Sequence, residues 1–312
     1  MTAFLGACAS APFQSGQAQP SPGASYCANL SARLMSVGTV TSQLEHPPDT
    51  IGGLSGIEFD STRDRYLLVT DDRGQNGGGR IYTASMVSGP GSAPVLQIDH
   101  ALSIVTAPTG GRPSPAVDVE SVRLFGRHRV IWSSEGDEAA GISPGIYRAT
   151  RGNGVGTALP LPSQLSPRPG LSEGPRPNRS FEGLAKGFRV GHYYAALEAP
   201  LAETDAMPSL ASGGVAPIFE IDERGHLHAQ FLYPLEPIAR HLPGRLADNG
   251  VSEILAPKQD TFLVLERSGS QQDDGSFRFV SRLYCAWAPQ RDADPKNTIE
   301  LRKRLVFDFM SA

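Results

Sequence analysis

The chain repeats a three-part pattern, whose first copy reads G-L-S-G-I-E-F-D (residues 53–60), Y-L-L-V-T-D-D-R-G (66–74) and R-I-Y-T-A-S (80–85). Short runs rich in Val, Ile, Leu, Tyr and Phe, bounded by Gly, Pro, Asp and Asn, are typical of β-strands. Later copies begin D-V-E-S-V-R-L-F (118–125), S-F-E-G-L-A-K-G-F (180–188) and G-V-S-E-I-L-A (250–256). In every copy a second apolar run ends in a carboxylate, and a third run contains Tyr or Phe.

The carboxylates that close the second run set the period of this repeat. Asp72, Glu135, Glu198 and Glu266 are separated by 63, 63 and 68 residues. Hairpins followed by an aromatic strand are typical of propeller blades, whose period is usually about 40–50 residues. The longer period leaves room for extra strands or partial blades. The sequence therefore predicts an all-β β-propeller of five or six blades, with six favoured; the alternative is a β-sandwich whose repeats are coincidental.

Composition limits the class of protein. The 312 residues are 39% hydrophobic, which suffices for a large core, and 34 Gly and 26 Pro predict many turns. The net charge of -4 argues against a nucleic-acid partner. No uncharged apolar stretch reaches the roughly 18 residues of a membrane-spanning helix.

The first residues carry a short lipoprotein-like motif. L-G-A-C at residues 5–8 resembles the bacterial lipobox, in which the cysteine is lipidated, although only seven residues precede Cys8. The Ser-, Pro-, Gln- and Gly-rich residues that follow suit a flexible tether. We therefore expect an N-terminal motif and tether over residues 1–25, a membrane anchor at Cys8, and a single propeller domain over residues 26–312. A disordered cytosolic tail with a chance match is the alternative.

Two further cysteines, Cys27 and Cys285, lie near the two ends of the predicted domain. In an exported protein an even pair without metal-type spacing indicates a disulfide, and ring closure in a propeller brings the chain ends together. The same closure predicts that residues 37–42 lie beside C-terminal strands. Two unpaired buried thiols are the alternative.

Hairpin geometry gathers the acidic residues of the repeat. The start of a first strand and the end of its partner lie at the same end of a blade, so eight carboxylates should surround one mouth of the central channel. In the first copy, Ser55 occupies the opening position. The candidate ligands are Asp71, Asp72, Glu120, Glu135, Glu182, Glu198, Glu253 and Glu266.

So many like charges require a partner of opposite charge. Oxygen ligands without His or Cys point to Ca²⁺, with Mg²⁺ as the second choice. Arg73, Arg267 and Lys186, together with Arg179, are candidates to neutralise the rim or to hold an anionic substrate. The alternative is structural: acids at strand ends often bond backbone amides of the next blade.

Four pairs of motifs resemble the phytase-like esterase family of bacteria. They are G-G-L-S-G-I-E-F-D with D-D-R-G, D-V-E-S with W-S-S-E-G, N-R-S-F-E-G-L-A with A-A-L-E-A-P-L, and V-S-E-I-L with L-V-L-E-R-S, in order over residues 52–287. The resemblance implies a β-propeller, export to the periplasm or cell envelope, and esterase or phosphoesterase activity.

The motifs of this chain depart from two signatures of related hydrolases. The β-propeller phytases carry D-A-x-D-D-P-A early in the chain, whereas this chain has only D-A-D-P at residues 292–295, so phytate is not the expected substrate. The stretch G-L-S-G around Ser55 lacks the G-x-S-x-G spacing of a nucleophile elbow, which argues against Ser55 as a nucleophile.

We therefore predict a monomeric hydrolase of small anionic esters, above all phosphoesters, supported by Ca²⁺. Glu135, Glu198, Arg73, Arg267 and Lys186 are the candidate catalytic residues. A bound cation would neutralise the substrate and activate water. The rival is a non-catalytic binding or scaffold propeller of the cell envelope, because a fold alone does not confer catalysis.

Overall fold

The structure is a computed structural model that describes residues 21–44, 51–89, 91–107, 114–165, 173–240, 245–289 and 298–310. Cys8, most of the expected tether and the D-A-D-P motif lie outside these residues. The described helices are α1 (Pro22–Asn29) and the 3-10 turn η1 (Ser163–Leu165). Neither is long and apolar enough to cross a bilayer.

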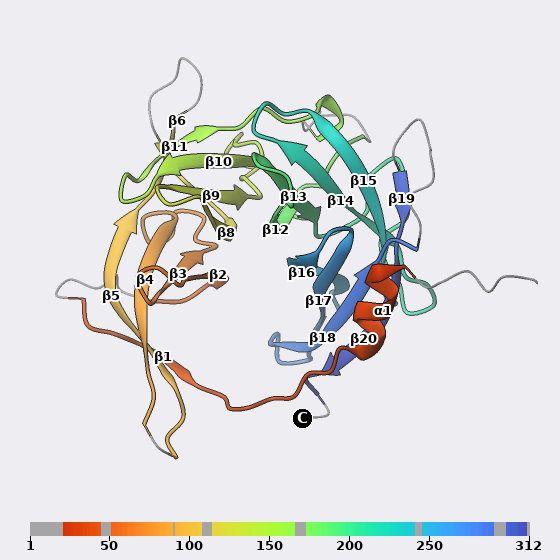
Figure 1. Cartoon of the computed structure of the whole chain (residues 1–312), viewed down its shortest axis with the longest axis horizontal. Coiled ribbons are helices and arrows are strands. Elements are labelled where there is room, and N and C mark those ends of the chain that lie inside the picture. The colour runs from red at the N-terminus through yellow and green to blue at the C-terminus, as the bar shows by residue number, and fades with distance from the viewer. Residues whose placement is uncertain are drawn as a thin grey trace, which may run out of the picture.

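Four β-sheets surround a common centre and form a β-propeller (Figure 1). The first contains β1 (Thr39–Ser42), β2 (Leu54–Asp60), β3 (Arg65–Thr70), β4 (Arg80–Val87) and β5 (Val95–Ser103). The second contains β6 (Val105–Ala107), β7 (Ser114–Pro115), β8 (Val119–Phe125), β9 (Arg129–Ser134), β10 (Gly145–Thr150) and β11 (Val155–Ala158). The third contains β12 (Phe181–Lys186), β13 (His192–Leu197), β14 (Val215–Asp222), β15 (Leu227–Pro234) and β19 (Thr298–Glu300). The fourth contains β16 (Ala247–Lys258), β17 (Thr261–Gln271), β18 (Phe277–Trp287) and β20 (Arg302–Asp308).

The described part of the chain therefore has four blades, and the prediction of five or six is wrong. Each blade contains a fourth antiparallel strand beyond the three expected, namely β5, β11, β15 or β20. The outer edges of three blades also carry a parallel strand, β1, β6 or β19. These strands and the long loops use the residues that the long period had left for extra blades.

Apolar side chains fill the space between consecutive sheets. Leu67 and Val69 of the first sheet share a core with Val122 and Trp132 of the second. A further core joins the second and third sheets around Phe181 and Phe219. Between the third and fourth, the rings of Tyr194 and Phe262 lie 5.0 Å apart and those of Phe231 and Phe262 lie 5.1 Å apart. These three cores fix the angular position of each blade.

The inner strands meet near a buried guanidinium on β8. Arg123, whose side chain is 2% exposed, donates to the carbonyl oxygen of Ile57 at 3.2 Å and to that of Ile254 at 3.1 Å. It also pairs with Glu253 at 2.7 Å. One side chain thus links the inner strands of the first, second and fourth sheets.

The N-terminal segment connects the fourth sheet with the first. The predicted disulfide between Cys27 of α1 and Cys285 of β18 is confirmed, with Cα atoms 5.5 Å apart. From α1 the chain crosses to the outer edge of the first sheet (Figure 1), where β1 pairs in parallel with β5. The expectation that residues 37–42 lie beside C-terminal strands is therefore wrong, because the chain contacts the fourth sheet around α1, whereas β1 pairs with β5 of the first sheet.

Candidate functional site

The innermost strand of every blade is interrupted at the same place. The pairing register shifts between Leu54 and Gly56 in β2 and between Val119 and Val122 in β8. It shifts likewise between Phe181 and Gly183 in β12 and between Val251 and Glu253 in β16. A β-bulge turns an extra side chain out of the regular alternation. The bulged positions hold Ser55, Glu120, Glu182 and Ser252, and all four line one central cavity.

A second set of cavity residues comes from the neighbouring strand of each blade. Asp71, Glu135 and Glu198 directly follow β3, β9 and β13. Their amides donate to the carbonyl oxygens of Gly53, Asp118 and Ser180 at 2.9, 3.0 and 2.8 Å. In the fourth blade β17 continues past this point, and Arg267 occupies the equivalent position, opposite Gly250. The repeat therefore presents three carboxylates and one guanidinium.

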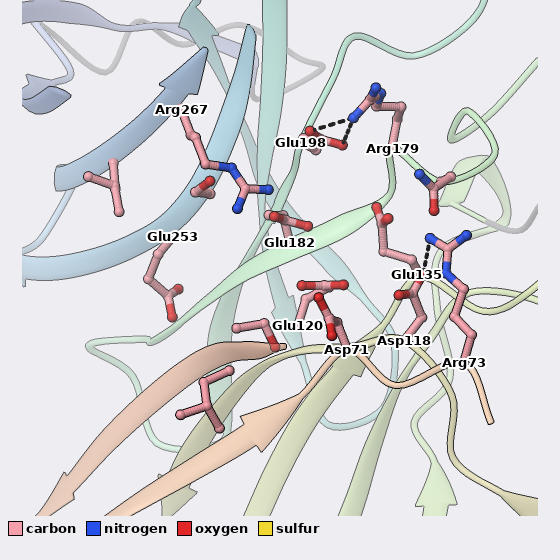
Figure 2. Close-up of a pocket in the computed structure, with 15 residues that line it drawn as sticks. Asp71, Arg73, Asp118, Glu120, Glu135, Arg179, Glu182, Glu198, Glu253 and Arg267 are labelled. Carbon is pink, nitrogen blue, oxygen red and sulfur yellow. Dashed lines mark hydrogen bonds and ion pairs between the residues drawn. The ribbon is translucent and has the colours of Figure 1, made fainter. Parts of the chain in front are cut away.

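These residues surround a cavity of about 370 Å³ (Figure 2). Its charged lining contains seven carboxyl groups and three guanidinium groups, so the cavity is strongly acidic. Its walls are formed by Leu54, Ser55, Asp71, Arg73, Asp118, Glu120, Glu135, Asn178, Arg179, Glu182, Glu198, Ser252, Glu253, Leu265 and Arg267. Six of the eight predicted carboxylates are among them.

The other two, Asp72 and Glu266, lie elsewhere. Neighbouring residues of a strand point to opposite faces, so Asp71 and Asp72 cannot both face the channel. Asp72 instead accepts hydrogen bonds from the amides of Gly74, Asn76 and Gly78 and organises the turn after β3.

Glu266 lies inside β17 and faces the third blade. It accepts hydrogen bonds from the Tyr233 hydroxyl at 2.6 Å, the Asn249 amide at 2.9 Å and the Lys303 ammonium at 2.6 Å. Among the residues described, Asp72 and Glu266 therefore behave as the structural alternative expects.

Lys186 also lies away from the cavity. It ends β12, at the opposite end from Glu182, and its ammonium pairs with Glu58 of the first blade at 2.6 Å. Four residues of extended strand separate Lys186 from Glu182 by roughly 13 Å. Ser55 donates its hydroxyl to the carbonyl oxygen of Val119, so its hydroxyl is used in contact between blades.

Three polar residues of the lining, Asp118, Asn178 and Ser252, were not among the predicted site residues. Asp118 and Asn178 have φ values of 49° and 53°, in a region that non-glycine residues rarely occupy. Gly53, the counterpart of Asp118 in the first repeat, has φ 60°. Alignment of D-V-E-S with G-L-S-G would have assigned Asp118 to this turn.

Two of the three arginines of the cavity are paired with carboxylates. The Arg73 guanidinium donates to Asp118 at 2.7 Å. Arg179 donates to both carboxylate oxygens of Glu198 at 2.8 and 3.0 Å (Figure 2). It also donates to Asp248. Arg267 forms no ion pair with a described residue, and its guanidinium stacks on the Phe279 ring at 5.2 Å.

The negative charges of the carboxyl groups in the middle of the cavity are less fully neutralised by arginine. Burial raises the pKa of Glu120 and of Glu182 well above 4.5, and neighbouring carboxylates raise both further. Burial, and then the charge of Glu198, raises the pKa of Glu135 to about 8 although the Ser180 amide bonds it. Burial also raises the pKa of Glu198, against the opposing effect of Arg179. Glu135, with a pKa of about 8, therefore retains its proton near neutral pH unless a cation is present.

The donor set fits a hard divalent cation. Carboxylate oxygens of Asp118, Glu120 and Glu135 lie within 4.8 Å of one another, as do those of Glu135, Glu182 and Glu198. Glu182 forms no hydrogen bond or ion pair with any residue in the described ranges, although it is 6% exposed. Oxygen donors alone are the set that Ca²⁺ and Mg²⁺ prefer.

A family model described as "Phytase-like: Esterase-like activity of phytase" matches residues 49–312. The chain belongs to this phytase-like family. The match begins just before the first bulged strand and covers every wall of the cavity. The resemblance predicted from the motifs is thus confirmed.

Other comparisons add little to this phytase-like assignment. No curated protein matches the chain. Among solved structures, the chain is similar to the β-propeller domain of Cps50 (Swd1) from Myceliophteria_thermophila, with 11% identity and a TM-score of 0.34 over 82% of this chain and 73% of that one. A likeness of this size carries no argument about function.

Proposed function

We propose that the protein hydrolyses anionic esters, above all phosphoesters, in the central cavity with the support of Ca²⁺. The observation that carries the proposal is the joint presence of buried carboxyls without a cation partner and of guanidinium groups in one cavity. Membership of a phytase-like family supports a hydrolytic reaction. Mg²⁺ is the second candidate.

Asp118, Glu120, Glu135, Glu182 and Glu198 would hold the cation, because they form the two groups of converging oxygens. Asp71 and Glu253 line the same cavity and complete its negative field. A bound divalent cation supplies charge neutralisation and a more acidic water.

The arginines are suited to bind the anionic group of the substrate. Arg267 is the strongest candidate, because no carboxylate among the described residues pairs with it. Arg73 and Arg179 are already held by Asp118 and Glu198, so their free N–H groups are fixed in direction. A guanidinium offers two parallel donors to a phosphate or carboxylate.

Glu135 and Glu198 are suited to transfer protons. Burial and then the charge of Glu198 raise the pKa of Glu135, and carboxylate oxygens of the two residues converge in one group. One carboxylate accepts a proton from the attacking water, and the protonated partner delivers one to the departing ester oxygen.

Purified protein tests the proposal. Addition of CaCl₂ should raise Tm with concentration, because a ligand that binds only the folded state stabilises it. Hydrolysis of p-nitrophenyl phosphate should depend on the ion and fall at least about a hundredfold in Glu135→Gln. Glu58→Gln, a change at a carboxylate outside the cavity, should retain both properties. Absence of divalent-cation binding and of phosphate- or carboxyl-ester hydrolysis would leave a binding or scaffold propeller.

We also propose export to the bacterial cell envelope, with anchoring at Cys8. The disulfide supports the proposal, because such bonds persist in oxidising compartments. Fractionation of cells that express the chain should recover it in the membrane fraction, and Cys8→Ser should release it. Recovery of both forms from the cytosol would contradict the proposal.

A further inference from the structure

The fourth sheet has an apolar face whose outer part, at Cys285, is covered by α1. Phe262 and Val264 of β17 point into the core with the third sheet, so Leu263, Leu265 and Arg267 face the other way. Residues directly opposite in the ladder share that face, which places Leu255 and Leu283 there. Leu255 is 51% exposed and Phe279, opposite Gly269, is 50% exposed.

The first sheet presents a similar face. Glu58 of β2 accepts a hydrogen bond from the Leu124 amide and therefore points to the second sheet. Ile57 and Phe59, on the alternate side of the strand, are 47% and 45% exposed. Leu54 packs on the same side, in the cluster around Leu68 and Tyr82.

Both faces reach the acidic cavity. In Figure 1 the first and fourth sheets are neighbours around the ring, and the N-terminal segment runs from one to the other. Leu54 of one face and Leu265 of the other line the cavity itself. Arg267 lines the cavity while it stacks on Phe279 of the apolar face. The charged and apolar surfaces are therefore continuous.

We propose that the substrate is amphiphilic, with an anionic ester group in the cavity and an alkyl or aryl group between the apolar faces of the first and fourth sheets. This inference rests on the proposed function and specifies its substrate class. Arg267 marks the junction, because it lines the cavity while its guanidinium lies over the Phe279 ring of the apolar face. An apolar group that leaves water at Ile57, Leu255 and Phe279 would supply affinity that a small polar ester cannot obtain.

Binding of two phosphonates, which the protein cannot hydrolyse, tests the inference by calorimetry in calcium-containing buffer. Each methylene that leaves water contributes roughly a fourfold gain in affinity. Because the faces are half-exposed, n-octylphosphonate should bind at least about tenfold more tightly than methylphosphonate. Ile57→Ser combined with Leu255→Ser should abolish this difference and leave methylphosphonate binding unchanged. Val190→Ser, which removes a fully exposed apolar side chain from a distant turn, is the matched control and should retain the difference.

The outcomes separate this inference from the proposed function. Equal binding of both phosphonates, or an octyl advantage that survives the double substitution, would overturn the amphiphilic substrate and leave an anion site intact. Failure of methylphosphonate to bind would overturn the proposed anion site as well. If a second copy of the chain covers these faces instead, the protein sediments as a dimer and Phe279→Asp makes it a monomer, which would also overturn the inference.

Discussion

Glu135 is a buried carboxyl whose protonation couples the cavity to the stability of the fold. Its pKa rises from 4.5 to about 8 on folding, so the folded state binds more protons than the unfolded state between these values. The stabilising contribution of the protonated group is therefore complete below about pH 4.5 and is lost as the pH rises through about 8.

Calcium-free protein should accordingly lose free energy of unfolding between pH 5 and pH 8. Glu135→Gln should weaken this dependence, because the amide does not titrate. The gain in Tm from CaCl₂ should increase with pH over the same interval, since the cation must displace protons. Urea unfolding at four pH values with and without calcium measures both effects; a calcium effect independent of pH would contradict the cation site.

Glu266 is the contrasting case of a carboxylate that serves the architecture. Its contacts with Tyr233, Asn249 and Lys303 join the third and fourth blades. Glu266→Gln should lower the free energy of unfolding by about 3 kcal/mol, because it leaves the Lys303 charge without its buried partner. The affinity for calcium, measured by calorimetry at a temperature where the variant is folded, should stay as in the original protein. A loss of calcium affinity without a loss of stability would show that Glu266 belongs to the cation site instead.

Gly53 creates the space that Asp71 needs. A Cβ at this position would overlap the Asp71 carboxylate, and φ of 60° is unfavourable for any side chain. Gly74→Ala is the matched control, since Gly74 has φ 99° and no atom within 4 Å of the place that a methyl group would occupy. Both substitutions should cost about 1–2 kcal/mol of backbone strain, but only Gly53→Ala should also weaken calcium binding. Equal calcium affinity in the two variants would exclude Asp71 from the site.

At the scale of elements, the disulfide holds α1 on the fourth sheet across a sequence separation of 258 residues. Cys27→Ala with Cys285→Ala should reduce the free energy of unfolding by about 2–5 kcal/mol, because the unfolded chain regains conformational freedom. Urea unfolding measures the change, and reduction of the original protein should reproduce it. The cavity contains no residue of α1, so calcium binding should survive; its loss would show that the helix positions the site.

The strands of the repeat were predictable because their apolar runs and turn residues are local signals. The bulges were not, since nothing in S-G-I or E-S-V marks an extra residue until the partner strand is known. For the same reason sequence alignment placed Asp72, rather than Asp71, with Glu135. In β17 the strand continues past Glu266, so the residue that reaches the cavity is Arg267.

At the scale of the whole molecule, the number of blades follows from which sheet each linking strand joins. β6 and β19 are three-residue strands that add to the edge of a blade by parallel pairing. Parallel pairing with a segment distant in sequence leaves no periodic pattern in so few residues. The propeller class followed from the repeat, whereas the division into four blades required the tertiary structure.

The path of β19 has a consequence for the order in which the protein can mature during synthesis. The third blade reaches from Phe181 to Pro234, yet its outer edge is completed by Thr298–Glu300, after the chain has already built most of the fourth blade. The disulfide of Cys27 likewise forms only after Cys285 has been synthesised. A nascent chain interrupted before residue 285 would therefore carry an open sheet edge and a free thiol together, the two features that promote aggregation and incorrect cross-linking. Addition of the C-terminal strands is therefore the step of synthesis that pairs the open sheet edge and allows the free thiol to form its disulfide.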